Sequence, residues 1–101
     1  MQPKEIYRSL VRLHILVAAS RGPIDSTAVA RNLDDRGFAL NLASVRHILR
    51  GFESKGYLVS TKSPNGRVHD TYAITRAGRL RVQDATQKVA KLIEMLGRTS
   101  R

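Results

Sequence analysis

The sequence predicts a mainly α-helical domain with one small antiparallel β-hairpin, an α+β class. Three observations point to this class. Over most of the chain, apolar residues recur three and four positions apart, which is the spacing of amphipathic helices. Between residues 58 and 74 the spacing changes to the alternation typical of strands. Asn65 and Gly66 stand at the centre of that segment, and this pair favours a tight hairpin because both residues tolerate positive φ.

Length and charge limit what the chain can be. Its 101 residues suffice for one domain with a modest core, without a second domain or a large catalytic cleft. Lys and Arg number 18 against 8 Asp and Glu, a net charge of +10. This charge predicts a polyanionic partner, with nucleic acid ahead of an anionic membrane surface. Cysteine is absent and the apolar run from Leu13 to Ala19 is too short to cross a bilayer, so we expect a cytoplasmic protein without metal, cofactor or membrane association.

The first helix is expected over residues 3–20. Proline near its start suits the first turn of a helix. The apolar face is broad enough to pack on two surfaces, and His14 beside it is interpreted as a partly buried core histidine. Lys4, Arg8 and Arg12 form a stripe on the polar side. The first interpretation of this stripe is a solvated face, and the second is contact with backbone phosphates.

A second helix is expected over residues 26–35, with Asp25 or Ser26 as its N-cap. The Arg-Gly-Pro-Ile segment before it is interpreted as a break between helices. Phe38 and Leu40 are expected to plug the turn that follows. Two helices joined in this way form a helix-turn-helix unit.

The third helix, residues 42–55, is the most informative about function. Asn41 is a suitable N-cap, and Gly56 sits where a left-handed residue would end the helix. The residues expected to form its buried stripe are Val45, Ile48, Leu49 and Phe52. The residues expected to face DNA bases, on the opposite side and its flanks, are Ser44, Arg46, His47 and Arg50. Such a surface can enter a major groove, where an arginine can bond both N7 and O6 of guanine.

Residues 58–74 are expected to form a hairpin with a basic tip. Lys62, Asn65, Arg67 and His69 are expected to contact the DNA backbone or the minor groove. Charged hairpin tips also keep a sheet edge soluble, and this alternative stays open. A helix-turn-helix followed by a basic hairpin is the layout of a winged helix-turn-helix that binds DNA. Residues 1–75 are therefore assigned to a DNA-binding unit.

Residues 76–101 are assigned to a C-terminal dimerisation helix and short tail within the same compact unit. Thr75 is expected to cap the helix, which runs to about Leu96 before a frayed tail. Its apolar face is larger than a small domain needs to close its own core. We expect two-fold pairing with a second copy, single-chain packing being the alternative. The residues assigned to the dimer interface are Val82, Ala85, Val89, Leu92, Ile93 and Leu96.

Several short motifs resemble the PadR-like winged-helix transcriptional regulators. They are Ala43-Ser44-Val45, Ile48-Leu49, Phe52-Glu53, Gly56-Tyr57-Leu58, Gly66-Arg67, Tyr72-Ala73-Ile74-Thr75 and Gly78-Arg79. The resemblance covers nearly the whole chain. It implies a DNA-binding regulator, usually a repressor, that is dimeric through its C-terminal helix. Arg46 and His47 depart from the family pattern, which commonly has tyrosine and proline there.

Other functional classes fit the sequence less well. An architectural or plasmid-partition-type DNA-binding protein would use the same fold without regulating a promoter, but base-directed Arg46, His47 and Arg50 favour specific recognition. A protein-interaction module is disfavoured by the net charge. No glycine-rich phosphate loop and no closely spaced histidine pair occurs, so we do not expect an enzyme. The sequence assigns no small-molecule effector.

Overall fold

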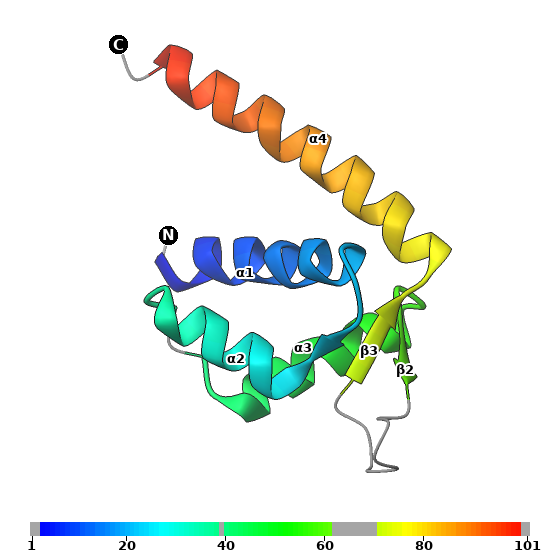
Figure 1. Ribbon diagram of the computed structural model, residues 1–101. Helices are drawn as coiled ribbons and strands as arrows, with labels where there is room; N and C mark the ends of the chain where they lie inside the picture. Colours follow the sequence, from blue (N-terminus) through cyan, green and yellow to red (C-terminus); the bar gives the residue numbers. More distant parts are fainter. Residues whose placement is uncertain (1–2, 39, 62–70, 100–101) are drawn as a thin grey trace.

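The computed structural model describes residues 3–38, 40–61 and 71–99. The elements in these ranges are α1 (Pro3–Ser20), β1 (Ile24–Asp25), α2 (Ser26–Asp35), α3 (Leu42–Ser54), β2 (Leu58–Thr61), β3 (Thr71–Ile74) and α4 (Arg76–Thr99). α1, α2 and α3 pack together beside the small sheet, whereas α4 starts next to β3 and extends away over α1 (Figure 1). The expected mainly α-helical fold with a small β-sheet is confirmed.

Side-chain caps set the starts of α2 and α3. The Asp25 carboxylate accepts a hydrogen bond from the backbone N–H of Ala28 at 3.0 Å, which satisfies a donor that the first helical turn leaves unpaired. Oδ1 of Asn41 accepts from the N–H of Ser44 at 2.8 Å in the same way. Both helices therefore begin where the cap residues predict.

A glycine with positive φ ends each of these helices. At the end of α3, Gly56 has φ of 83° and its N–H donates to the carbonyl of Glu53, while the N–H of Tyr57 donates to the carbonyl of Phe52. This pair of bonds is the Schellman motif, which favours glycine because a Cβ is strained at that φ. Gly37, with φ of 87°, ends α2 by the same motif. The chain direction after α3, and hence the position of β2, follows from this turn.

The sheet is antiparallel, with β3 between β1 and β2. Leu58 pairs with Ile74, and Ile24 pairs with Tyr72. β1 is missing from the sequence-based assignment, which interprets this segment only as a break between helices. A strand of two residues is too short to show alternation, and its pairing with β3 is distant in sequence.

The core lies where the inner faces of α1, α2, α3 and the sheet meet. Its buried apolar side chains are Val11, Ile15, Leu16, Ala19, Ile24, Leu33, Val45, Ile48, Leu49, Leu58 and Tyr72. The stripe predicted for α3 is confirmed at Val45, Ile48 and Leu49, and Phe52 packs against the core while partly buried. This burial fixes which side of α3 faces outward.

Three local expectations are wrong. His14 is exposed, because the core-facing side of α1 is the one that buries Val11 and Ile15. Phe38 does not plug the turn: it is 40% exposed, and its ring centroid lies 6.2 Å from that of Tyr7 in an edge-to-face contact.

α4 continues to Thr99 instead of fraying after Leu96. A 2.6 Å ion pair between Arg98 and Glu94, one turn apart, supports this last turn.

Candidate nucleic-acid interface

The surface of α3 opposite the core is polar and open to solvent. His47 and Arg50 are exposed there, whereas Ser44 and Arg46 are half-buried on the two flanks. Ala43 and Ser54 complete the outward face with small side chains. His47 and Arg50 therefore lie on the open surface of α3, and Ser44 and Arg46 lie at its two edges.

The predicted DNA-contacting residues of the hairpin tip, Lys62, Asn65, Arg67 and His69, lie outside the described residues. The strands that lead to the tip are described, and Thr61 pairs with Thr71 at their open end. The Glu53 carboxylate of α3 accepts hydrogen bonds from the Ser60 N–H at 3.1 Å and from the Ser60 hydroxyl. These bonds hold β2 along the flank of α3 that also carries Arg46.

Thr75 holds three elements together. Its N–H donates to the carbonyl of Tyr57 at 3.0 Å, and its hydroxyl donates to the carbonyl of Gly56 at 2.6 Å. Its Oγ1 also accepts from the N–H of Gly78 at 3.0 Å, so the prediction that Thr75 caps the last helix is confirmed. The end of α3, the end of β3 and the start of α4 thus meet at one side chain.

Arg79 has a structural contact in the first turn of α4, where a cation opposes the helix dipole. Its Nη1 donates to the backbone carbonyl of Ser20 at 3.2 Å. Ser20 is the last residue of α1, and the final carbonyls of a helix have no partner within it. Arg79 therefore ties the end of α1 to the start of α4.

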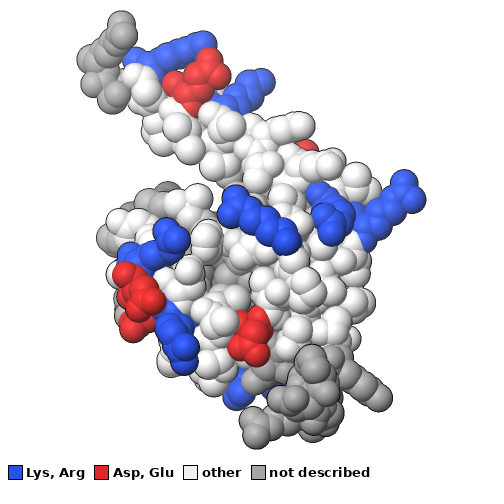
Figure 2. Space-filling view, viewed as in Figure 1, with Lys and Arg blue, Asp and Glu red and all other residues white. Residues whose placement is uncertain are grey.

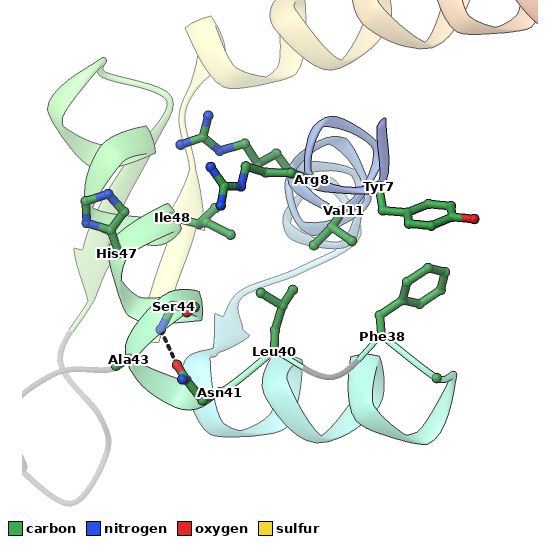
Figure 3. A pocket seen from close by; sticks show the side chains of 12 residues that line it. Tyr7, Arg8, Val11, Phe38, Leu40, Asn41, Ala43, Ser44, His47 and Ile48 are labelled. Atoms are coloured by element: carbon green, nitrogen blue, oxygen red, sulfur yellow. Dashed lines mark hydrogen bonds between the residues drawn. The ribbon is translucent and has the colours of Figure 1, made fainter. Parts of the chain in front are cut away.

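A groove with a volume of about 770 Å³ runs between α1 and α3. Figure 3 shows Arg8 reaching from α1 toward α3, where Ile48 and His47 project, while Tyr7 and Phe38 lie together at the other end. A second hollow of about 390 Å³ shares Arg12 and Ile48 with the first and continues to the C-terminal end of α3. We call the two hollows together the α1–α3 groove.

The cations of the α1–α3 groove are not predicted as a group by the sequence. They are Arg8 and Arg12 from α1, Lys55 at the end of α3 and Arg81 from α4. Sequence spacing alone assigns Arg8 and Arg12 to the polar side of α1. In the structure Arg8 shares a helix face with Ile15, seven residues later, whose side chain is buried.

The apolar face of α4 is only partly covered. Val82, Ala85 and Val89 are half-buried, and Val82 packs against the core. Beyond them, Leu92, Ile93 and Leu96 are 56%, 63% and 66% exposed. This end of the helix projects from the body of the molecule (Figure 2). Packing within one chain accounts for the burial of Val82, Ala85 and Val89. It leaves Leu92, Ile93 and Leu96 uncovered.

Membrane spans and metal centres are two other kinds of site that the described residues do not provide. None of the described helices combines the length and apolar composition needed to span a bilayer. Within the described part of the chain, no three His, Cys, Asp or Glu side chains gather where they could hold a metal ion.

A helix-turn-helix with a third helix exposed on one side, followed by an antiparallel strand pair, defines the winged helix-turn-helix class. No protein-family model matches the sequence. The transcriptional regulator Rv3488 of Mycobacterium tuberculosis is 29% identical over 96 residues, which are 93% of this chain and 90% of that protein.

Solved structures show the same architecture over almost the whole chain. A PadR-like transcriptional regulator from Bacillus cereus superposes with a TM-score of 0.83 and 16% identity, covering 96% of this chain and 97% of that one. A PadR-family regulator from Eggerthella lenta gives a TM-score of 0.79 and 21% identity, covering 93% and 84%. The chain therefore has a PadR-like winged-helix fold.

Proposed function

We propose that this protein is a sequence-specific DNA-binding transcriptional regulator that represses its target promoter as a homodimer. The observation that carries the proposal is the exposed polar face of α3, with His47 and Arg50 opposite a fully buried stripe. The PadR-like fold, and the relative from M. tuberculosis that is named a transcriptional regulator, support it. Such a protein would act in the cytoplasm, where chromosomal DNA is accessible.

Base recognition is assigned to α3 and its flanks. Residues 42–55 would lie in the major groove, where Arg50 can donate two hydrogen bonds to one guanine. His47 stands one helical turn before Arg50, and Ser44 one turn before His47, so the three can follow successive base pairs. Arg46 would reach the groove from the flank next to β2.

The hairpin, residues 58–74, is assigned to backbone or minor-groove contacts. From their place in the sequence, Lys62, Arg67 and His69 would supply cationic or donor groups for these contacts, and Asn65 would join them. Contacts to phosphates would fix the register of α3 without reading sequence. The two bonds from Ser60 to Glu53 support this arrangement, because they hold the strand that leads to the tip against α3.

A second copy of this chain is the proposed partner of the exposed part of α4. Leu92, Ile93 and Leu96 continue the stripe that packs on the core at Val82, so the interface would extend the existing apolar face. Two-fold pairing of such helices gives a self-complementary interface. It would present two α3 helices to half-sites about 34 Å apart, one turn of DNA. An occupied operator then blocks access to the promoter.

The test begins with selection of bound fragments from genomic DNA, which yields an operator. Competition of that operator against random DNA should show a preference of ~10³-fold or more. Equal affinity for both would reject sequence-specific regulation and favour the architectural or partition-type alternative. Absence of DNA binding at low salt would reject both and favour a protein-interaction module.

The role of Arg50 has its own test. Arg50→Ala should weaken operator binding by about 1–3 kcal/mol and relax specificity at one base pair, if the side chain makes a bidentate contact with guanine. Binding is measured on the operator, on random DNA and on operators with single base changes. An equal decrease in affinity for operator and random DNA would show that Arg50 contacts phosphate instead.

A further inference from the structure

Arg8 and Arg12 are exposed, and they lie on the side of α1 that borders the α1–α3 groove. Arg8 precedes Ile15 by seven residues and Ala19 by eleven, and all three positions fall on one face of a helix with 3.6 residues per turn. Ile15 and Ala19 are buried in the core, whereas Arg8 extends past it along the α1–α3 groove (Figure 3). Arg12 lines both hollows of the groove. If Arg8 and Arg12 belonged only to a solvated face of α1, they would point away from α3.

The α1–α3 groove carries cations and no acids among the described residues. Arg8 and Arg12 line its larger hollow, and Arg12, Lys55 and Arg81 line the smaller one. Basic side chains of α4 have acidic neighbours, and this includes Arg81 of the smaller hollow: Asp84 contacts Arg81 at 3.7 Å and Lys88 at 3.1 Å, and Glu94 contacts Arg98 at 2.6 Å. On the face shown in Figure 2, acidic groups lie beside basic ones at the end of α2 and along the far part of α4. Arg8, Arg12 and Lys55 therefore concentrate positive charge along the groove.

This charge lies on the flank of α3 opposite the sheet. β2 is bonded to α3 through Glu53, on the side that carries Arg46. The groove is lined by Ser44, Ile48 and Gly51, which belong to the other side of the helix. The outward face, with His47 and Arg50, thus stands between the hairpin strands and the groove cations.

We infer that Arg8, Arg12 and Lys55 form a second phosphate-binding strip, which holds the DNA strand on the side of α3 away from the hairpin. The inference rests on the proposed function. The major groove is about 12 Å wide and a helix with its side chains is about 10–12 Å across, so phosphates flank an inserted helix on both sides. With the hairpin on one DNA strand and this strip on the other, the protein holds both DNA backbones that border the major groove.

The test compares two double variants that remove equal charge. Arg8→Gln/Arg12→Gln changes the strip, and Lys91→Gln/Arg98→Gln changes exposed cations of α4 on the face opposite its apolar stripe. Operator and random-DNA affinities are measured across a range of salt concentrations, and unaltered thermal unfolding checks that both variants fold. The slope of log K against log salt falls by ~0.9 for each phosphate that the variant no longer neutralises, up to ~3.6 for four phosphates bound by a dimer.

The expected result is a reduced salt slope for the strip variant alone, with the operator preference over random DNA unchanged. Equal slopes for the two double variants would overturn the strip while leaving the proposed function intact, since Arg50→Ala tests base recognition separately. A third outcome combines two results. Inorganic phosphate raises the unfolding temperature of the wild type but not of the strip variant, and the salt slopes of DNA binding are equal for the two double variants. The groove would then be a site for a free anion. That outcome also overturns the inference.

Discussion

Thr75 is a single residue whose hydroxyl serves as both donor and acceptor. It donates to the carbonyl of Gly56 and accepts from the N–H of Gly78, so its removal would leave two backbone groups without a protein partner. Its Cγ2 methyl group takes no part in these bonds. The Thr75 hydroxyl therefore links the start of α4 to the end of α3.

Thr75→Ala should lower the free energy of unfolding by about 1–2 kcal/mol, the usual cost of losing an N-cap, with the bond to Gly56 adding to it. Thr75→Ser keeps the hydroxyl and should retain most of the stability. Urea denaturation monitored by circular dichroism measures both. A serine variant as unstable as the alanine variant would show that the methyl group, and not the hydroxyl, matters here.

Ser26 is an unusual polar residue because its side chain is fully buried in the first turn of α2. Its Oγ has no hydrogen-bond partner among the described residues. An unsatisfied buried hydroxyl costs about 1–3 kcal/mol, so Ser26→Ala should leave stability unchanged or raise it. Asp25→Ala next to it removes the cap and should destabilise by about 0.5–2 kcal/mol. Thermal unfolding of the two variants measures both changes in stability. A clear decrease for Ser26→Ala would show that the Ser26 hydroxyl makes a stabilising hydrogen bond.

At the level of whole elements, the helices could be predicted because their signals are local. Asp25, Asn41 and Thr75 act as the caps that their residue types suggest, and Gly56 ends α3 as expected. β1 could not be predicted, since its two residues become a strand only by pairing with β3, far along the chain. The groove cations escape prediction for a related reason. The apolar spacing of α1 puts Arg8 on the polar side of the helix, and only the packing of the chain shows that α3 lies beside it.

The start of α4 packs so closely on the α3–β2 turn that glycine is required at one position. A Cβ at Gly78 would lie 2.3 Å from the carbonyl oxygen of Tyr57 and 2.7 Å from Cγ1 of Ile74. Gly78→Ala should therefore destabilise by about 1–3 kcal/mol through overpacking. Gly97→Ala is the matched control, because it lies in the same helix with nothing within 4 Å of a new Cβ. It should stabilise by up to ~1 kcal/mol through helix propensity.

Chemical denaturation of the two glycine variants measures this difference. Opposite signs of the stability change would confirm that contact with the turn, and not helix propensity, controls position 78. A stabilised Gly78→Ala would mean that α4 can shift away from Tyr57 at little cost. The junction would then be too loose to fix α4 relative to α3.

On the proposed function, the molecule would separate DNA contact from assembly. The proposed DNA-reading face and the groove are built on α1, α3 and the hairpin strands, whereas the exposed apolar stripe lies on the far half of α4. The hydrogen-bonded and closely packed junction at Thr75 and Gly78 connects the two, so pairing of α4 would set the distance between the two α3 helices. Sequence reasoning could find the apolar stripe, but only the folded chain shows that its first half is used within one copy and its second half is left over.

Leu92→Asp should convert the protein from dimer to monomer, since it places a charge in the centre of the proposed interface. Leu80→Asp is the matched control, because Leu80 is equally exposed but lies on the opposite side of α4. Sedimentation at micromolar concentration should give a dimer for wild type and Leu80→Asp, and a monomer for Leu92→Asp. The monomer should also bind a two-half-site operator far more weakly than the dimer, while binding a single half-site as the wild-type protomer does. A wild-type monomer at that concentration, or dissociation by Leu80→Asp to the same extent, would remove α4 as the interface and with it the spacing predicted for the operator.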